Sequence, residues 1–244
     1  MAAASAALSG QAQTADTPSS PPPATLPEVL VVAPREQDPI YWATNAVAPL
    51  KTEVPLLETP QAVSVIPRAL FNDQGSRKLE SVLKNAAGVS YGGYYGEWDY
   101  FRIRGFDASD KVYLDGLMSG LYSPNEELWG LEQVQVIKGP TSSLYGSGSP
   151  GGFVNLVSKR PRKEFFGETR LTVGSYGFYE ADFDINGALD ADAGLYGRLN
   201  AMYRQNDSFV DYAGAERFFI APALTWEIGP ETRHVADQHQ ERQH

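Results

Sequence analysis

The chain contains no cysteine, and its three histidines, His234, His239 and His244, all lie at the C-terminal end. Without cysteine there are no disulfides and no thiolate chemistry. Without histidine, most of the chain lacks the commonest general base and a frequent metal ligand. We therefore predict that the protein is not an enzyme and that it has no catalytic residues, no metal site and no cofactor of its own.

Long apolar runs and an excess of positive charge are also missing. No apolar stretch reaches the length of about 20 residues that a transmembrane helix needs, so any membrane span must be built from β-strands. The formal net charge of −10 argues against nucleic acid as a partner. A length of 244 residues leaves room for one or two domains.

The most distinctive stretch runs from Leu131 to Pro161, where two short apolar segments flank a loop rich in Gly, Ser and Pro. The β-branched residues before the loop and the apolar residues after it predict one strand on each side. Within the loop, Gly146, Gly148 and Gly151 formally match the dinucleotide-binding pattern G-x-G-x-x-G. Such a pattern binds pyrophosphate where it opens a helix, whereas a strand is predicted here.

This stretch resembles the signature of the plug domain of TonB-dependent outer-membrane receptors. The matching elements occur in the family's order and extend to two further motifs nearer the N-terminus. They are Val134–Pro140, Leu144–Gly146, Gly151–Gly152, Lys159–Pro161, Ile103–Phe106 followed by Tyr113–Gly116, and Thr59–Pro67. The similarity covers about residues 28 to 229 and is greatest to the ferric-siderophore branch. It implies an α+β plug domain followed by antiparallel β-strands of an incomplete transmembrane β-barrel.

The N-terminal part is predicted to be a leader followed by a linker. Residues 1–13 are rich in Ala and Ser, which predicts a residual signal peptide or a disordered tail. Residues 14–51 form a proline-containing linker with an apolar hexad that is either a core strand or a TonB box. A TonB box adds as a strand to the energy-coupling protein TonB. Because the hexad has no obvious partner strand, we assign the box to Glu28, Val29, Leu30, Val31, Val32 and Ala33.

Residues 52–161 are the predicted plug, with a strand at 62–66 and a helix at 78–84. Residues 91–100 concentrate aromatic rings among glycines, and such rings either pack inside a domain or face a ligand. The resemblance implies that this loop and the loop at 118–122 touch a metal chelate from below. The candidate ligand-binding residues are Tyr94, Tyr95, Trp98, Ser119, Gly120 and Tyr122.

Two basic residues match positions at which the family latches the plug to glutamates of the barrel wall. Solvated charge is the alternative for either residue, but a basic group inside a barrel needs a partner or water. The resemblance assigns the latch to Arg104 and Lys138. Lys138 departs from the commoner Arg and lacks its planar bidentate geometry.

Residues 162–229 show a period of two over four predicted strands. Apolar Tyr179, Ala181, Phe183 and Ile185, for example, alternate with polar residues at 180, 182, 184 and 186. A soluble sheet with one solvated face would give the same pattern. The resemblance instead implies barrel strands with an apolar outer face and a polar inner face. Residues 230–244 lose the alternation, which predicts a non-native or disordered tail produced by a frameshift or an artificial terminus.

The function implied by the resemblance is a receptor and transporter for a ferric siderophore, in which iron enters only as the bound chelate. It would lie in the outer membrane of a Gram-negative cell, with the plug and N-terminus facing the periplasm and TonB supplying energy. Plugged transporters have about 22 strands, so we expect this chain to be a fragment that does not work alone. The alternatives are a stand-alone periplasmic plug-like binding module and a nucleotide-binding enzyme that uses residues 146–151.

Overall fold

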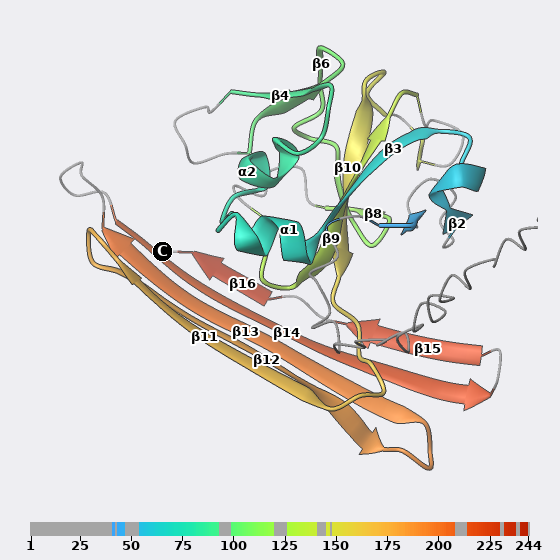
Figure 1. Cartoon of the computed structure of the whole chain (residues 1–244), viewed down its shortest axis with the longest axis vertical. Helices are drawn as coiled ribbons and strands as arrows, with labels where there is room; N and C mark the ends of the chain where they lie inside the picture. Colours follow the sequence, from blue (N-terminus) through green and yellow to red (C-terminus); the bar gives the residue numbers. More distant parts are fainter. Residues whose placement is uncertain are drawn as a thin grey trace, which may run out of the picture. The chain divides into compact units, whose positions relative to one another are not determined.

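The computed structural model describes residues 41, 43–46, 54–92, 99–119, 126–140, 145–146, 148–207, 214–229, 232–237 and 240–243. Within these residues no helix is both long and apolar enough to cross a membrane. The described chain forms one domain around a mixed sheet, residues 54–158, and one sheet of long strands that follows it (Figure 1). We call them the mixed-sheet domain and the long-stranded sheet.

The mixed-sheet domain is organised around a five-stranded sheet with the strand order β3-β9-β10-β7-β8. Strands β10 and β7 are parallel, and the other neighbours are antiparallel. A smaller sheet, β4-β5-β6, and a two-stranded ladder, β1-β2, complete its strands. The bounds are β1 Asn45–Ala46, β2 Val54–Pro55, β3 Ala62–Pro67, β4 Val89–Tyr91, β5 Phe101–Ile103, β6 Phe106–Asp107, β7 Val112–Leu114, β8 Leu117–Met118, β9 Leu131–Lys138 and β10 Gly152–Ser158.

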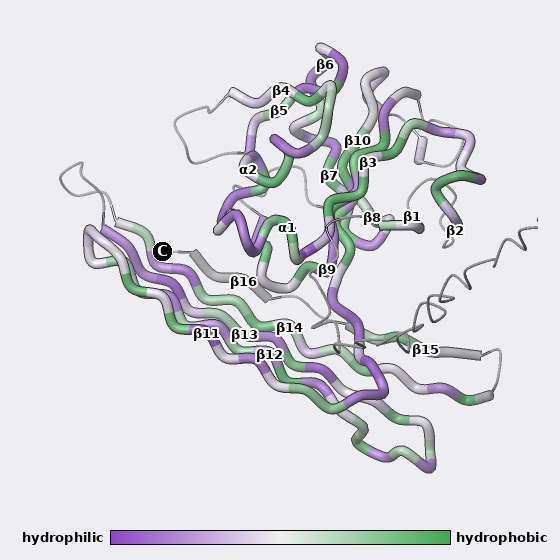
Figure 2. Tube along the Cα trace, in the orientation of Figure 1, coloured by the Kyte–Doolittle hydropathy of each residue, from purple (hydrophilic) through white to green (hydrophobic). Residues whose placement is uncertain are grey.

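Two short helices, α1 Arg68–Asp73 and α2 Leu79–Leu83, cover this sheet, and a 3-10 turn, η1, spans Leu56–Glu58. Leu79, Val82 and Leu83 have the spacing of one helix face and are all buried. They join β9 and β10 residues in a single apolar core, and Figure 2 shows the hydrophobic stretches of these strands. The strands predicted on both sides of the glycine loop and the predicted helix at 78–84 are therefore confirmed.

The glycine loop ends where two glycines touch neighbouring backbone. A Cβ on Gly151 would lie 2.0 Å from the carbonyl oxygen of Ile103, and one on Gly152 would lie 1.9 Å from that of Ile137. Gly152 also has a φ of +127°, which L side chains rarely adopt. The glycines thus allow close strand packing, and strand β10 begins at Gly152, directly after the last glycine of the pattern. Among the described residues, the pattern leads into a strand and not into a helix N-terminus that could hold a phosphate, which does not support the nucleotide-binding hypothesis.

The long-stranded sheet is antiparallel, with the order β11-β12-β13-β14-β15, and β16 also pairs with β14. Its first four strands run side by side in Figure 1 and confirm the predicted four. The bounds are β11 Phe166–Gly174, β12 Phe178–Asp190, β13 Leu195–Asp207, β14 Gly214–Gly229, β15 Thr232–Asp237 and β16 Gln240–Gln243. Strands β15 and β16 lie in residues 230–244, where the sequence predicts a non-native or disordered tail. The open edge of β14 explains this, because backbone groups can pair without an alternating side-chain pattern.

The two faces of the long-stranded sheet have inverted polarity. On β12 the acidic residues Glu180, Asp182 and Asp184 are buried, whereas Tyr179 is 57% exposed. On β14, Trp226 is 50% exposed, but the buried face carries Phe219, Ala221, Ala223 and Thr225, so the inverted polarity is clearest on β12. A sheet in water buries its apolar face, so this arrangement agrees with the predicted apolar outer face and polar inner face.

The close approach at Gly152 gives a stability prediction. Gly152→Ala should lower the free energy of unfolding of the mixed-sheet domain by about 3 kcal/mol or more, because the methyl group must push β9 and β10 apart. Urea denaturation followed by circular dichroism measures this. Gly92→Ala is the control, since a Cβ there meets no atom within 4 Å. Equal stability of the Gly152→Ala variant and the parent would contradict the packing described above.

Candidate functional site

The candidate site is the contact between the mixed-sheet domain and the inner face of the long-stranded sheet. A row of buried acidic residues on β12 lies on this face. A buried charge is costly unless a partner charge or several hydrogen bonds satisfy it. The partners of these acids therefore show what holds the two parts of the chain together.

Asp184 is the centre of the first ionic cluster. Its side chain is fully buried, and Lys159 Nζ donates to its Oδ2 at 2.9 Å. Arg198 on the neighbouring strand donates from Nε and Nη2 to the two carboxylate oxygens at 2.9 and 2.8 Å. Lys159 also donates to Asn200 Oδ1 at 3.0 Å, and Arg68 Nη1 lies 3.8 Å from Asp184 Oδ2. One carboxylate thus binds cations from both parts of the chain.

Lys159 follows β10 and is itself fully enclosed in this cluster. Burial lowers the pKa of Lys159 to about 7, and the nearby positive charge of Arg68 adds to the decrease, while Asp184 opposes it. The ion pair with Asp184 therefore stabilises a charge that burial alone would disfavour. The backbone N–H of Lys159 donates to Gly130 O at 2.9 Å, which fixes the chain where it leaves the mixed-sheet domain.

Trp129 is the aromatic centre of the contact. Lys159 Nζ lies 4.0 Å from its ring centroid, and the guanidinium carbons of Arg68 and Arg170 each lie 4.7 Å away. Such cation–π contacts are strongest where water is excluded, and Trp129 is buried. Its indole N–H donates to Phe183 O on β12 at 3.0 Å. The indole N–H therefore binds the backbone of the sheet, and the π-system of the ring contacts three cations.

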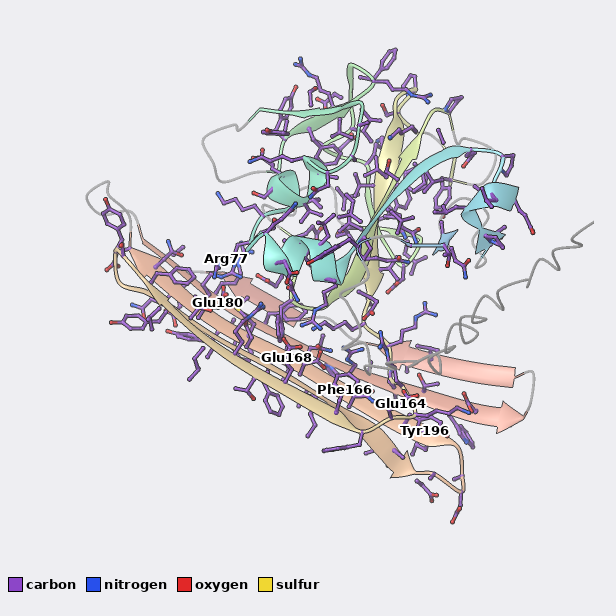
Figure 3. The ribbon with its side chains drawn as sticks, viewed as in Figure 1. Arg77, Glu164, Phe166, Glu168, Glu180 and Tyr196 are labelled. Carbon is purple, nitrogen blue, oxygen red and sulfur yellow. The ribbon has the colours of Figure 1, made fainter. Side chains whose placement is uncertain are left out.

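Glu127 is the centre of the second ionic cluster, two residues before Trp129. Its carboxylate binds Arg204 and Arg217 of the long-stranded sheet at 3.3 and 3.4 Å. Arg204 also forms an ion pair with Glu180, which in turn accepts from Arg77 Nε at 3.1 Å. Figure 3 shows Arg77 directed toward Glu180. Acids and arginines of both parts alternate in this cluster, so each charge has an opposite neighbour.

A small solvent-open hollow of about 30 Å³ lies beside the second cluster. The turn between α1 and α2 lines one side, and Glu180, Asp182 and Arg204 line the other. Among the described residues, no group of acids or histidines is arranged to hold a metal ion. The hollow is polar and charged, which suits ordered water between the two parts better than an apolar ligand.

Asp99 connects three segments of the mixed-sheet domain. Its carboxylate accepts from the backbone N–H of Glu80, in the first turn of α2, and from that of Glu126, at 3.4 and 3.3 Å. Burial raises the pKa of Asp99 to about 6, the two backbone hydrogen bonds lower it, and the carboxylates of Glu80 and Glu126 raise it further. In sequence, Asp99 directly follows residues 93–98, and Glu126 directly follows residues 120–125.

The structure describes only some of the residues predicted to be functional. The TonB box at 28–33 and the candidates Tyr94, Tyr95, Trp98, Gly120 and Tyr122 lie outside the described residues. Ser119 is described, and its hydroxyl donates to Glu126 Oε1 at 2.7 Å. These assignments stay predictions.

Arg104 and Lys138 lie next to each other in the mixed-sheet domain. Arg104 Nη1 would be 3.2 Å from a Cβ on Gly139, and Lys138 Nζ donates to Ser64 Oγ at 2.8 Å. Burial lowers the pKa of Lys138, and the charge of Arg104 lowers it further. Among the ion pairs of the described residues, neither cation has a carboxylate partner, so the latch stays a prediction.

Sequence analysis missed the residues that make the contact from the mixed-sheet side. They are Arg68, Arg77, Glu127, Trp129 and Lys159. They form no periodic pattern in the sequence, and Arg77, Glu127 and Lys159 lie beside residues of like charge, so nothing marks them as contact residues. The acidic residues at 180, 182 and 184 could have predicted this contact. A charged inner face of the sheet requires opposite charges on the domain that covers it.

Comparison with known proteins gives a consistent match. A family described as "TonB-dependent Receptor Plug Domain" matches residues 55–153. The chain is 37% identical over 212 residues to the metal-pseudopaline receptor CntO of Pseudomonas aeruginosa, covering 84% of this chain and 30% of that protein. It is 40% identical over 193 residues to the ferrioxamine B receptor of Salmonella typhimurium, covering 75% and 27%.

Solved structures agree with these matches. The pyoverdine outer membrane receptor FpvA from Pseudomonas aeruginosa, bound to pyoverdine, superposes with a TM-score of 0.78 at 25% identity. The aligned part covers 84% of this chain and 31% of that chain. The chain therefore spans about a third of the length of the proteins it matches.

The raised pKa of Asp99 gives a pH prediction. Between pH 4 and pH 7 the folded chain holds the Asp99 proton more tightly than the unfolded chain, so ionisation destabilises the fold as the pH rises. A shift from 3.8 to about 6 corresponds to on the order of 2–3 kcal/mol. Relative to Asp99→Asn, the parent should lose up to that amount between pH 4 and pH 7, measured by urea denaturation. A difference in stability that does not change with pH would contradict the assignment.

Proposed function

Since this chain belongs to the family of TonB-dependent receptors, we propose that it forms the plug and first wall strands of an outer-membrane receptor for a ferric siderophore. The mixed-sheet domain is the plug, and the long-stranded sheet is part of the barrel wall. The receptor would bind the chelate above the plug and pass it inward when energy from TonB moves the plug. Iron is cargo in this process and needs no ligands from the protein itself.

The inverted polarity of the long-stranded sheet is the observation that carries this proposal. Its exposed face presents large apolar side chains, including Leu171 at 78% and Phe218 at 45% exposure. Its buried face presents acids and arginines that bind the mixed-sheet domain. A bilayer would cover the first face and the plug covers the second. A stand-alone periplasmic plug-like module would leave the apolar face without a purpose.

A siderophore is the favoured substrate class because of the relatives and the loop composition. The matched proteins are named for ferrioxamine B, pyoverdine and metal-pseudopaline. We infer that Tyr94, Tyr95, Trp98, Ser119, Gly120 and Tyr122 contribute to the surface that meets the chelate. The ties from Asp99 and Ser119 to Glu126 support this, since they join the ends of both candidate loops.

The contact combines ion pairs with one apolar cluster, in which Trp129 packs against Met202, Phe219 and Ala221 of the long-stranded sheet. Its ionic part suits a plug that has to move. Packing between apolar surfaces would cost free energy along its whole area when separated, because water cannot replace the lost contacts. Ion pairs next to a hydrated hollow can instead be exchanged for hydrogen bonds with water, and net salt-bridge energies are small where water enters. The pair of Arg77 and Glu180, which borders the hollow, is therefore the part of the contact that can be released most easily, whereas the enclosed cluster around Asp184 positions the plug.

The TonB box gives a test of energy coupling. In a full-length receptor that contains this chain, Val31→Pro removes a backbone donor and should disturb strand addition to TonB. Uptake of a ferric chelate should fall to the level of a strain without TonB, while binding at the cell surface persists. Val31→Thr, which keeps both the donor and the β-branch, serves as the control. Normal uptake by the Val31→Pro receptor would remove the box from residues 28–33.

We further propose that Arg104 and Lys138 latch the plug to acidic residues of the barrel wall. The proximity of two cations supports this, because such a pair is most stable when a carboxylate lies between them. In the full-length receptor, Arg104→Gln should make the plug several times more sensitive to added protease. Arg102→Gln is the matched control, since Arg102 lies on β5, two residues before Arg104, but is paired with Tyr100. Equal protection in both variants would favour a simple solvated arginine at position 104.

A further inference from the structure

The chain passes from the mixed-sheet domain to the long-stranded sheet through residues 159–165, between the end of β10 and the start of β11. We call these residues the junction segment. Two consecutive cross-strand pairs on the inner face of the sheet contact it. Asp184 on β12 is the register partner of Asn200 on β13, and Asn186 is the register partner of Arg198. All four side chains are buried, so their polar groups depend on the segment for partners.

Asn186 binds the main chain of the junction segment at three points. Its Oδ1 accepts the backbone N–H of Arg162 at 2.8 Å. Its Nδ2 donates to Arg162 O at 3.0 Å and also to Glu164 O. Asn186 is 1% exposed, so its amide uses its oxygen and both N–H donors where water has little access. The side chain therefore pairs with the segment as the backbone of a neighbouring strand would.

The other three side chains hold the first residues of the junction segment. Arg198 Nη1 donates to Arg160 O at 3.0 Å, while its Nε and Nη2 donate to Asp184. Asp184 and Asn200 in turn accept from the Lys159 ammonium at 2.9 and 3.0 Å. The long-stranded sheet therefore holds the segment through hydrogen bonds from several buried side chains, on two adjacent strands.

Two exposed ion pairs link later residues of the junction segment to the mixed-sheet domain. Arg160 Nη2 lies 3.9 Å from Asp115 Oδ1, and Arg162 pairs with Glu132. The two arginine side chains are 52% and 53% exposed. Ion pairs at this exposure contribute little net free energy, because water competes for each charge. The buried hydrogen bonds to the sheet therefore outweigh them.

We propose that Asn186 is a positioning residue that makes the junction segment a part of the long-stranded sheet. The border between the two parts then lies at Lys159 and not at residue 161, where the predicted plug ends. Lys159 contacts both parts, since its ammonium binds Asp184 and its backbone N–H binds Gly130 O. The significance of this border rests on the proposed function, because a plug that moves would turn about Lys159 while residues 160–165 stay on the barrel wall.

Native-state hydrogen–deuterium exchange at rising urea concentration tests the border, on the 244-residue chain in detergent micelles. Amides that open together in one cooperative unit share the same dependence of exchange on urea. We expect the amides of residues 160 and 162–165 to open together with those of β11 and β12, and separately from those of β9 and β10. Any other grouping, including a single transition of the whole chain, would overturn the proposal.

Two substitutions on opposite sides of the junction segment give a matched comparison. Asn186→Leu removes the acceptor and both donors at similar size, so exchange of residues 160–165 should rise about tenfold or more and no longer follow β11 and β12. Glu132→Gln removes the ion pair with Arg162 and should leave the grouping unchanged.

A merely local role of Asn186 would change the Arg162 amide alone, and this result would contradict the proposal, as would a lost grouping in Glu132→Gln. Where Asn186→Leu fails to fold, the grouping in the parent chain and in Glu132→Gln still decides the question. None of these measurements involves a chelate, so a failure of the proposed function would appear separately.

Discussion

A buried carboxylate is stable only when cations surround it, and Asp184 obtains its cations from two parts of the chain. Arg198 comes from the neighbouring strand, whereas Lys159 and Arg68 come from the mixed-sheet domain. Neither part could satisfy Asp184 alone at this degree of burial. The inner face of the sheet and the surface that covers it therefore have to form together. The placement of Trp129 and the second cluster around Glu127 follow from the same requirement.

The contact combines fixed and hydrated regions. Around Asp184 and Lys159 the charges are fully enclosed, and the chain itself passes from one part to the other at this point. Around Arg77 and Glu180 the contact borders the hollow, and 38% of the Arg77 side chain is exposed. Ion pairs in contact with water are weaker and easier to exchange than enclosed ones. The strength of the contact thus decreases from the covalent junction toward the α1–α2 turn.

Much of the fold could be predicted from local pattern. The alternation at 179–186 predicted both faces of β12, and the spacing of Leu79, Val82 and Leu83 predicted helix α2. The contact itself could not be predicted, because Glu127 and Trp129 acquire their roles from strands far away in the sequence. The strands β15 and β16 were missed for a different reason, since they pair through backbone groups at the edge of β14 and leave no side-chain signature.

The arginine pair opposite Glu127 has an evolutionary consequence. Arg204 on β13 and Arg217 on β14 are register partners and both pair with Glu127, so we expect the effects of substitutions at these three positions to depend on one another. The two parts of the chain therefore cannot diverge independently at this contact. Chimeras that join a plug and a wall from different lineages would meet this epistasis at the first strands they exchange.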